Sequence, residues 1–370
     1  DGTKLKINNV LIGEVWFTSG QSNMEMMVYG FINCPTENSA DFIAGSGKYR
    51  DKIRMVSIPR FPLRQPGDFV DAQWKECLPE VVRNFSAVGY FFATQLVDKL
   101  NCPVGIINNA WGGTRVEGWT PRQLLESYGE DLSTKTFQSR ATSWTPMVMY
   151  NGMVKPLAGY NIRGFLWYQG EANVGWQPED YANRFGNMMK QGDLPFLFVE
   201  IAPYKYSQGT AAAIVREQQC ETQHLVNNAY MVCTNDLVKP YESTQIHPCM
   251  KFEVAERLSM LAFSKVYGMA GIEAQSPEYQ TMEIKDGRAT LSFSHVGAGF
   301  NRFEDIQGFE IAGKDKNFVP AHASVSGRRI VVSSPLVKEP TAVRYCFKAW
   351  QPGNLASGDN LPVIPFRTDK

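Results

Sequence analysis

Short, continuous apolar runs alternate with amphipathic segments from the start of the chain to about residue 270. The apolar runs have the length of strands that are buried on both faces of a parallel sheet. They lie at residues 13–19, 54–58, 104–108, 162–167, 195–201 and 230–234. Helical periodicity appears at residues 86–100, 121–128, 181–191, 212–226 and 251–267. Strands and helices in alternation predict an α/β fold whose sheet carries helices on both sides.

The hydrophobic pattern changes at about residue 276. From there on, short segments of alternating apolar and polar residues are separated by turn signals such as Asp286-Gly287. These segments lie at residues 290–293, 308–311, 329–333 and 342–347. We therefore expect two domains, an α/β domain over residues 1–275 and a small antiparallel β module over residues 276–370.

Polar residues follow directly after several of the predicted strands. They are Ser22, Gly112-Gly113, Gln169-Gly170-Glu171 and Asp236. In an open α/β sheet, ligands bind outside the carboxyl ends of the strands. The sequence thus predicts that these segments converge on one site at that edge of the sheet.

Composition indicates a globular chain and narrows its partners. Of the 370 residues, 44% are hydrophobic and 20% are charged, which provides for a large core. Lys plus Arg and Asp plus Glu number 37 each, and no basic run is interleaved with aromatic residues, so a nucleic-acid partner is disfavoured. The seven cysteines are scattered without close pairs, so we expect no metal site.

No apolar stretch is long enough to predict a membrane span, and the N-terminus lacks the order of a signal peptide. The chain begins abruptly in a strand-like pattern. We therefore expect that a leader or an upstream segment has been removed and that the protein is secreted or periplasmic.

The candidate chemistry centres on Ser22, which follows an apolar run and sits in a sharp polar turn. A serine hydroxyl is a poor nucleophile unless a base accepts its proton. His247 is the best candidate base because it lies on a loop before a helix, whereas His224 falls within a helical pattern. This pair is typical of an ester hydrolase, although a Ser-Asn dipeptide by itself equally predicts a turn or a helix cap.

An acyl-transfer enzyme also needs donors aimed at the oxyanion that develops on the attacked carbonyl. We expect these donors to be the backbone N–H of Ser22, the backbone N–H of Gly113 and the side-chain amide of Gln169. Two adjacent glycines let the backbone approach a substrate closely. Glycine pairs also make plain turns, so this assignment depends on the neighbouring segments.

Several blocks of the chain resemble the sialate O-acetylesterase family of SGNH hydrolases. They are Gly13-Glu14-Val15-Trp16, Ser19-Gly20-Gln21-Ser22-Asn23-Met24, residues 111–119, Tyr150-Asn151-Gly152-Met153, residues 167–173 and Ile246-His247-Pro248. The resemblance implies a flavodoxin-like three-layer sandwich with a parallel sheet and a C-terminal β module. It also implies deacetylation of carbohydrates without a cofactor, with Ser22 as nucleophile and His247 as base.

The chain departs from this family pattern just before the histidine. Many SGNH enzymes carry an aspartate two or three residues upstream, whereas this chain has Gln245 and Thr244. We favour Asp236 as the acid that orients His247. The alternatives are Glu242, Glu171 or a Ser–His dyad without an acid.

The sequence leaves the substrate open between acetylated sialic acid and acetylated plant-wall polysaccharide. We expect Arg115, Glu171 and Trp176 to bind it. Arg115 suits a sialate carboxylate, unless it forms a structural ion pair with Glu117, whereas a neutral xylan prefers exposed aromatics such as Trp144 or Trp176. An inactive carbohydrate-binding protein and a serine esterase for lipids or thioesters are the alternative functions. The oligomeric state is not predicted.

Overall fold

The computed structural model describes residues 2, 4, 6–301 and 305–370. In this part of the chain, a seven-stranded sheet has the order β3-β2-β4-β1-β5-β6-β7. All neighbouring strands are parallel except the edge pair of β3 and β2. The strands are β1 (Glu14–Gly20), β2 (Ile53–Ser57), β3 (Lys75–Glu76), β4 (Val104–Ala110), β5 (Gly164–Tyr168), β6 (Phe196–Val199) and β7 (Ala229–Val232).

The order of the inner strands confirms the flavodoxin-like arrangement. When the edge strand β3 and its neighbour β2 are left out, the remaining order β4-β1-β5-β6-β7, numbered along the chain, is 2-1-3-4-5. The chain crosses from one side of β1 to the other between β4 and β5. The topological switch point therefore lies where β1 and β5 end, and such a crevice is where ligands bind in doubly wound folds.

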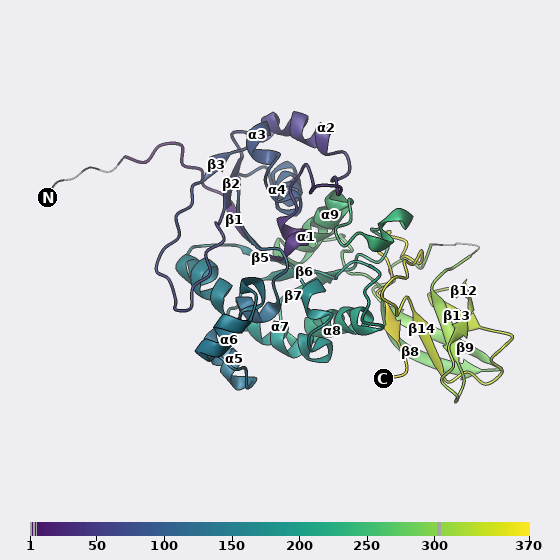
Figure 1. The fold of residues 1–370 in the computed structure, drawn as a ribbon. Coiled ribbons are helices and arrows are strands. Elements are labelled where there is room, and N and C mark those ends of the chain that lie inside the picture. Colours follow the sequence, from purple (N-terminus) through teal and green to yellow (C-terminus); the bar gives the residue numbers. More distant parts are fainter. Residues whose placement is uncertain (1, 3, 5, 302–304) are drawn as a thin grey trace.

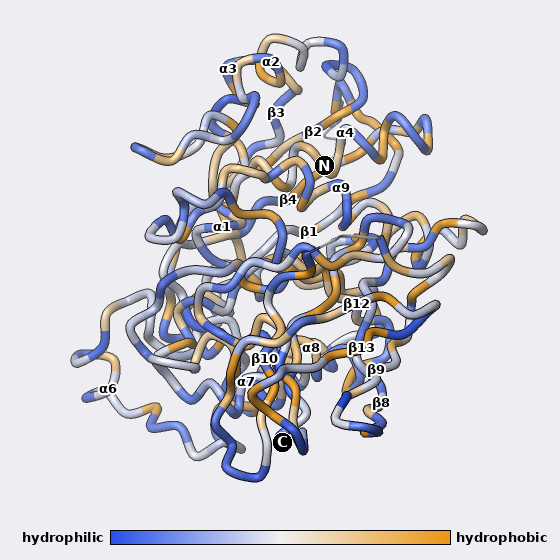
Figure 2. Tube along the Cα trace, turned by 90° about the vertical axis from the view of Figure 1, so that its right-hand side faces the viewer, coloured by the Kyte–Doolittle hydropathy of each residue, from blue (hydrophilic) through white to orange (hydrophobic). Residues whose placement is uncertain are grey.

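Helices cover both faces of the sheet and complete three layers (Figure 1). Helices α4 (Ala87–Leu100) and α9 (Lys251–Leu261) pack on one face in a core with Trp16, Ile106 and Leu166. Helices α7 (Tyr181–Met189) and α8 (Ala211–Leu225) contribute to the core on the other face. Figure 2 shows that hydrophobic segments run through the interior of the molecule, as this layering requires. The other α-helices are short: α1 (Ser22–Glu25), α2 (Ser39–Ala44), α3 (Pro79–Val82), α5 (Arg122–Ser127) and α6 (Thr134–Ser139).

The C-terminal part forms two four-stranded antiparallel sheets, with orders β11-β10-β14-β15 and β12-β13-β9-β8. Their strands are β8 (Glu278–Lys285), β9 (Arg288–Ser294), β10 (Phe309–Ala312), β11 (Val319–Pro320), β12 (His322–Ser326), β13 (Arg329–Ser333), β14 (Ala342–Tyr345) and β15 (Phe366–Arg367). The two sheets share a core of their own, with Leu291, Ile311 and Ile330 fully buried. The predicted antiparallel β module is confirmed, while a domain boundary at residue 275 stays a prediction.

Two further features concern the cellular location of the protein, namely the length of its apolar helices and the state of its cysteines. None of the helices that the structure describes is both long and apolar enough to cross a bilayer. All seven cysteines are free thiols, and most of them are buried. The secreted or periplasmic location expected from the sequence stays a prediction.

Candidate active site

Strand β1 ends level with its two neighbours, because Gly20 pairs with Ala110 of β4 and with Tyr168 of β5. Gly20 has a φ of +130°, and a Cβ there would clash with the carbonyl oxygen of Tyr168. Only glycine therefore allows the chain to leave the sheet at this point. Helix α1 begins two residues later, and its first residue is Ser22. The candidate nucleophile thus lies at the topological switch point.

The structure brings His247 against Ser22 across 225 residues of sequence. The imidazole Nε2 lies 2.8 Å from the serine Oγ, which is hydrogen-bonding distance. The loop that carries His247 is fixed by a hydrogen bond from its backbone N–H to the side chain of Gln245, at 3.2 Å. Phe31 packs edge-on against the imidazole, with ring centroids 5.1 Å apart. The geometry is that of a serine poised beside a general base.

Two buried residues that the sequence reasoning missed hold this pair in place. The Asn23 amide nitrogen donates to Glu171 Oε1 at 2.5 Å and to the carbonyl oxygen of Ile246 at 3.0 Å. Lys251 Nζ donates to Asn23 Oδ1 and to the carbonyl oxygen of Pro248, both at 2.8 Å. These bonds join α1, the loop after β5 and the residues on both sides of His247. The sequence signal was positional, since Asn23 follows Ser22 and Lys251 comes four residues after His247.

The structure does not place Asp236 as the acid that orients His247. Both of its carboxylate oxygens accept hydrogen bonds from the guanidinium of Arg257, at 2.7 and 2.6 Å. Arg257 also donates to the carbonyl oxygen of Cys233, so this pair ties α9 to the end of β7. The expectation for Asp236 is corrected to a structural ion pair, because a bidentate arginine occupies the side chain.

Neither alternative acid contacts the imidazole either. Glu242 accepts the backbone N–H groups of Lys239 and Cys249, at 2.7 and 2.8 Å. Glu171 is buried and accepts the amide of Asn23, and burial raises its pKa. Among the described residues, no hydrogen bond to the second ring nitrogen of His247 is seen. Of the candidate catalytic residues, Ser22 and His247 are therefore the two that the structure brings into contact.

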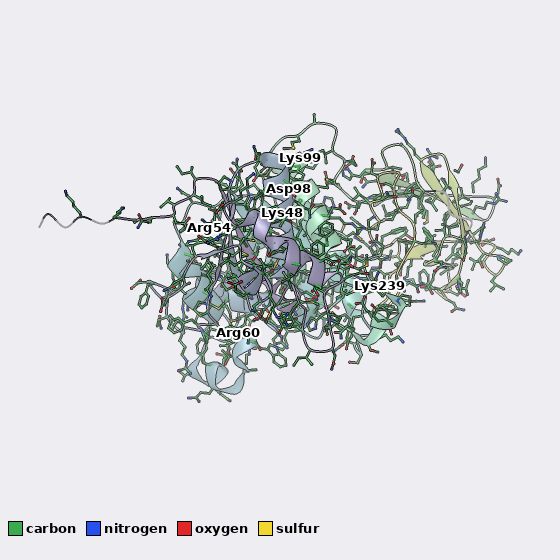
Figure 3. The ribbon with its side chains drawn as sticks, turned by 90° about the horizontal axis from the view of Figure 1, so that it is seen from above. Lys48, Arg54, Arg60, Asp98, Lys99 and Lys239 are labelled. Carbon is green, nitrogen blue, oxygen red and sulfur yellow. The ribbon has the colours of Figure 1, made fainter. Side chains whose placement is uncertain are left out.

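The Gly112-Gly113 turn lies directly against the serine. A Cβ on Gly112 would come within 3.2 Å of the Ser22 Cβ, so a side chain there would press on the nucleophile. The N–H of Gly112 donates to Glu25 Oε2 at 2.8 Å, and Arg60, labelled in Figure 3, holds the other oxygen of Glu25. The exposed Gly113 has a φ of +73°, and no acceptor for its N–H is found in the described residues. Gly113 is therefore the residue of this turn whose N–H is available to an oxyanion.

Gln169 does not have the geometry of an oxyanion donor. Its side chain is fully buried, and its Nε2 donates to the carbonyl oxygen of Thr114 at 3.0 Å and to Asn173 Oδ1 at 2.7 Å. A side-chain amide has two N–H donors, and both are used in these bonds. The expectation is corrected: Gln169 supports the backbone next to Gly113 and does not itself face a substrate.

Arg115 stacks on two tryptophans beside this turn. Its guanidinium carbon is 4.4 Å from the ring centroid of Trp144 and 4.5 Å from that of Trp176. Trp144 is 44% exposed, and its indole N–H donates to the carbonyl oxygen of Gly113 at 3.1 Å. Burial lowers the pKa of Arg115, but a guanidinium keeps its charge in proteins. The Arg115 cation is therefore stacked on two aromatic faces, one of which is hydrogen-bonded to Gly113.

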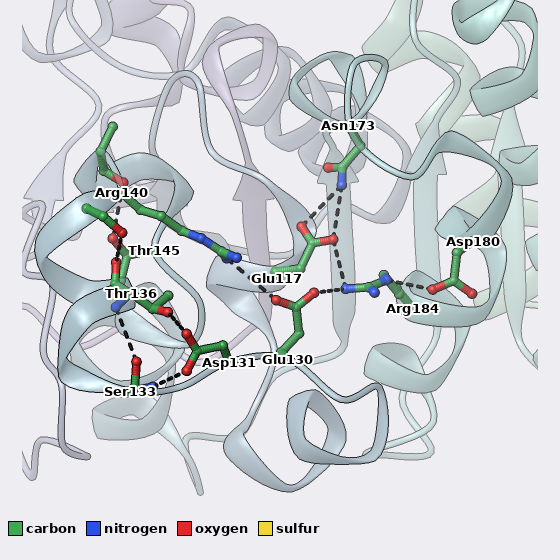
Figure 4. Close-up of polar contacts among 12 residues, drawn as sticks. Glu117, Glu130, Asp131, Ser133, Thr136, Arg140, Thr145, Asn173, Asp180 and Arg184 are labelled. Carbon is green, nitrogen blue, oxygen red and sulfur yellow. Dashed lines mark hydrogen bonds and ion pairs between the residues drawn. The ribbon is translucent and has the colours of Figure 1, made fainter.

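The proposed ion pair between Arg115 and Glu117 is not formed. Glu117 is buried and instead pairs with Arg184 at 3.2 Å, and it accepts the amide of Asn173 (Figure 4). Asn173 also accepts a hydrogen bond from Gln169, so this buried network fixes the side chain of Gln169 behind the Gly112-Gly113 turn. Glu171 is likewise a supporting residue, since its carboxylate is buried against Asn23. Of the three expected substrate-binding residues, Arg115 and Trp176 stack on each other, and Glu171 lies apart with a buried carboxylate.

The titration of His247 gives a prediction for the pH profile. Burial, reinforced by the nearby Lys251 cation, lowers the pKa of His247 from 6.5 to about 4. Protonation of Nε2 abolishes a general base, so a lowered pKa extends activity to lower pH. We expect kcat/KM to stay level from neutral pH down to about 5 and to fall with a midpoint near 4. Initial rates, with circular dichroism to monitor folding, measure this midpoint.

A lysine variant checks the cause of that shift. Lys251→Met removes the cation beside His247, so the midpoint should move toward 6.5. Lys239→Met, at a surface lysine paired with Glu37, is the matched control and should leave it unchanged. A wild-type midpoint at or above 6.5 would contradict the proposed environment of the base.

A doubly wound sheet with a Ser–His pair at its switch point belongs to the α/β class of enzymes. A family model described as carbohydrate esterase, sialic acid-specific acetylesterase, matches residues 68–260, which is just over half of the chain. The chain belongs to this family, and the prediction of an ester hydrolase is confirmed at that level. The matched range includes Gly113 and His247, and Ser22 lies ahead of it.

Relatives and a solved structure extend the similarity over nearly the whole chain. The sialate O-acetylesterase of Pongo abelii is 26% identical over 94% of this chain and 72% of its own length. The sialate O-acetylesterase of Mus musculus is 26% identical over 98% of this chain and 78% of its own length. The crystal structure of a carbohydrate acetylesterase from Xanthomonas citri has a TM-score of 0.86 and 32% identity, and covers 97% of this chain and 81% of that one.

Proposed function

We propose that this protein is a serine O-acetylesterase that removes acetyl groups from sugars, and that its preferred substrates carry a carboxylate, as sialic acid does. The observation that carries the proposal is the 2.8 Å contact between Ser22 Oγ and His247 Nε2 at the switch point. The family supports the substrate class, and this contact supports a serine mechanism. The similarity to sialate O-acetylesterases supports the same substrate.

The first half of the reaction transfers the acetyl group to the enzyme. His247 Nε2 takes the proton of Ser22 as Oγ attacks the acetyl carbonyl, and a tetrahedral intermediate forms. The backbone N–H groups of Ser22 and Gly113 stabilise its negative oxygen. When the intermediate collapses, the bond between the carbonyl carbon and the sugar oxygen breaks, and that oxygen takes the proton from His247.

The second half returns the enzyme to its starting state. Water occupies the place of the sugar, His247 Nε2 removes one of its protons, and the water oxygen attacks the acetyl carbonyl of Ser22. Collapse of the second intermediate breaks the ester bond to Ser22 Oγ. The serine regains its proton from His247, and acetate leaves.

The dyad must stabilise the imidazolium ion without a carboxylate partner. Burial and the nearby Lys251 disfavour this ion in the resting protein. In the tetrahedral intermediate, the negative oxygen lies next to the imidazolium and offsets this cost. The ring is held in place by Phe31 and by the hydrogen-bonded loop around Gln245, so orientation does not require an acid.

Arg115 is the basis for proposing an acidic sugar. Its Nε donates to the carbonyl oxygen of Ala172 at 3.3 Å, which leaves the two terminal nitrogens to bind a carboxylate bidentately. The faces of Trp144 and Trp176 hold the guanidinium plane in position. A neutral polysaccharide would use the tryptophans but would leave the cation without a partner.

We expect Arg115→Met to raise KM for an acetylated acidic sugar by about 10- to 100-fold and to change kcat little, because a charge-assisted contact is made equally in the ground and transition states. Steady-state kinetics on O-acetylated sialic acid measures this effect. Arg122→Met, at an exposed arginine paired with Glu126, is the control and should behave as wild type. An unchanged KM in the Arg115 variant would contradict the proposal that Arg115 binds the substrate carboxylate.

Hydrolysis of a substrate panel, measured as release of the acyl group, tests the proposed function as a whole. The panel contains O-acetylated sialic acid, acetylated xylan, 4-nitrophenyl acetate, a long-chain lipid ester and an acyl thioester. We expect turnover of the acetyl esters, with the highest kcat/KM on the acidic sugar. Highest kcat/KM on xylan would favour the plant-wall substrate, preference for long acyl chains would favour a lipid esterase, and absence of any turnover would favour a carbohydrate-binding protein.

A further inference from the structure

One side of α8 faces the C-terminal sheets and carries polar residues at helical spacing (Figure 1). Residues 216, 220 and 224 are four apart and therefore lie in one stripe along the helix. Arg216, in the first half of α8, donates to the carbonyl oxygen of Cys346 at 2.9 Å. At the far end, His224 Nε2 lies 2.7 Å from Glu278 Oε1, on the first residue of β8. This stripe is thus a polar seam between the α/β part and the β module.

Cys220 lies in the middle of this seam and completes a cluster of three donor groups. The Cys220 Sγ, a ring nitrogen of His224 and a carboxylate oxygen of Glu278 all lie within 4.8 Å of one another. Gln223 Nε2 donates to Cys220 Sγ at 3.6 Å and to Glu278 Oε2 at 3.4 Å, which orients two of the three groups. One thiol, one imidazole and one carboxylate therefore lie close enough together to share one ion.

We propose that Cys220, His224 and Glu278 form a zinc-binding site that links α8 to β8. Sulfur, imidazole nitrogen and carboxylate oxygen are the donor types that zinc takes, and a pair of ligands four apart on a helix lies on one face. A tetrahedral ion separates its ligand atoms by roughly 3.3–3.7 Å, given bond lengths of about 2.0–2.3 Å. Side-chain shifts of about 1 Å bring the cluster to that spacing, and His224 is half exposed and free to make them.

A cavity of about 300 Å³ adjoins the cluster and gives the ion an entry path. Cys220 and Glu278 line it, together with Glu217, Arg367 and Lys370. The opening leaves room for a water molecule as the fourth ligand. Glu217 pairs with Arg367 at 2.8 Å and with Lys370 at 3.6 Å, so its carboxylate is already neutralised and does not compete for the metal.

The proposal departs from the expectation, drawn from the sequence, that the chain has no metal site. That expectation rested on the absence of close cysteine pairs. The spacing Cys-x₃-His on a helix, Cys220 to His224, is a two-ligand signal that a search for paired cysteines does not detect. The third ligand comes from the next part of the chain, and only the fold brings it near. The proposal is independent of the esterase chemistry, because no residue of the dyad takes part.

Titration with Zn²⁺ and Co²⁺ tests the site. The full chain, freed of metal by a chelator, should bind one Zn²⁺ in calorimetry and gain a few degrees in its melting temperature. With Co²⁺ it should develop the ultraviolet thiolate-to-cobalt charge-transfer band. Cys220→Ser should abolish the band and weaken Zn²⁺ binding by at least about 10-fold, since a first ligand matters at least as much as its supporting contacts.

Two further variants keep the result interpretable. His224→Gln changes an exposed side chain that is easily accommodated, and it should weaken Zn²⁺ binding as Cys220→Ser does. Cys102→Ser, at a partly buried cysteine outside the cluster, is the matched control and should bind as wild type. Absence of Zn²⁺ binding, or a cobalt–thiolate band that persists in Cys220→Ser, would overturn the proposal and leave a plain His–Glu ion pair.

Discussion

Replacement of Ser22 by alanine is expected to lower kcat for acetyl esters by roughly 10³-fold or more and to leave the fold intact. The substitution removes the attacking oxygen and little volume. The hydroxyl of Ser22 contacts His247, and the helix that Ser22 begins is fixed by Asn23 and by backbone bonds that alanine retains. Initial rates of 4-nitrophenyl acetate hydrolysis, with a melting curve for each variant, measure both effects.

Ser57→Ala is the matched control. Ser57 is an exposed serine at the end of β2, at the same edge of the sheet, and its loss should not change kcat. Near-wild-type turnover in Ser22→Ala would end the serine-esterase account.

Replacement of His247 by glutamine should reduce kcat by about 10³- to 10⁴-fold. Glutamine fills much of the same space beside Phe31 but cannot take the serine proton at Oγ. Asp236→Asn, by contrast, should change kcat by less than about 3-fold, because Asp236 binds Arg257 and stands apart from the reaction. The same assay compares both variants directly.

His322→Gln, at an exposed histidine on β12, controls for general effects of the substitution. A large loss of kcat in Asp236→Asn with an unchanged melting temperature would contradict the dyad and would restore an acid to the mechanism.

The sequence predicted the sheet well because its strands are buried on both faces. The run from Val104 to Asn108 is apolar at nearly every position, and it forms the start of β4 as expected. Parallel strands end level, so residues that follow them converge whatever their sequence separation. This rule placed Ser22 and Gly112-Gly113 at one edge, and the structure brings them together.

The roles of side chains behind the site could not be predicted in the same way. Asp236 and Gln169 both follow strands, as Ser22 does. Each side chain, however, is hydrogen-bonded to residues of another part of the chain. Asp236 binds Arg257 of α9, and Gln169 binds Thr114 and Asn173. Position after a strand determines where a residue lies, whereas its direction depends on contacts that the local sequence does not contain.

Lys251 is a residue whose role in the site could not be predicted from the sequence. A lysine in the first turn of a helix is ordinarily exposed, since burial of its charge is costly. Here it is fully buried, because Asn23 and the carbonyl of Pro248 satisfy its ammonium group. Burial lowers its pKa to about 8. Only the assembled site shows that this residue supports the nucleophile and the base together.

The central claim is that the acetyl group passes through Ser22. An acid quench during turnover of 4-nitrophenyl acetate, followed by peptide mass spectrometry, tests it most directly, because this activated ester makes the acetyl-enzyme accumulate. The account predicts one acetyl group on the peptide that contains Ser22 in the wild-type protein, and none in Ser22→Ala. Rapid turnover with an unmodified Ser22, or an acetyl group on another residue that disappears as substrate is consumed, would contradict it.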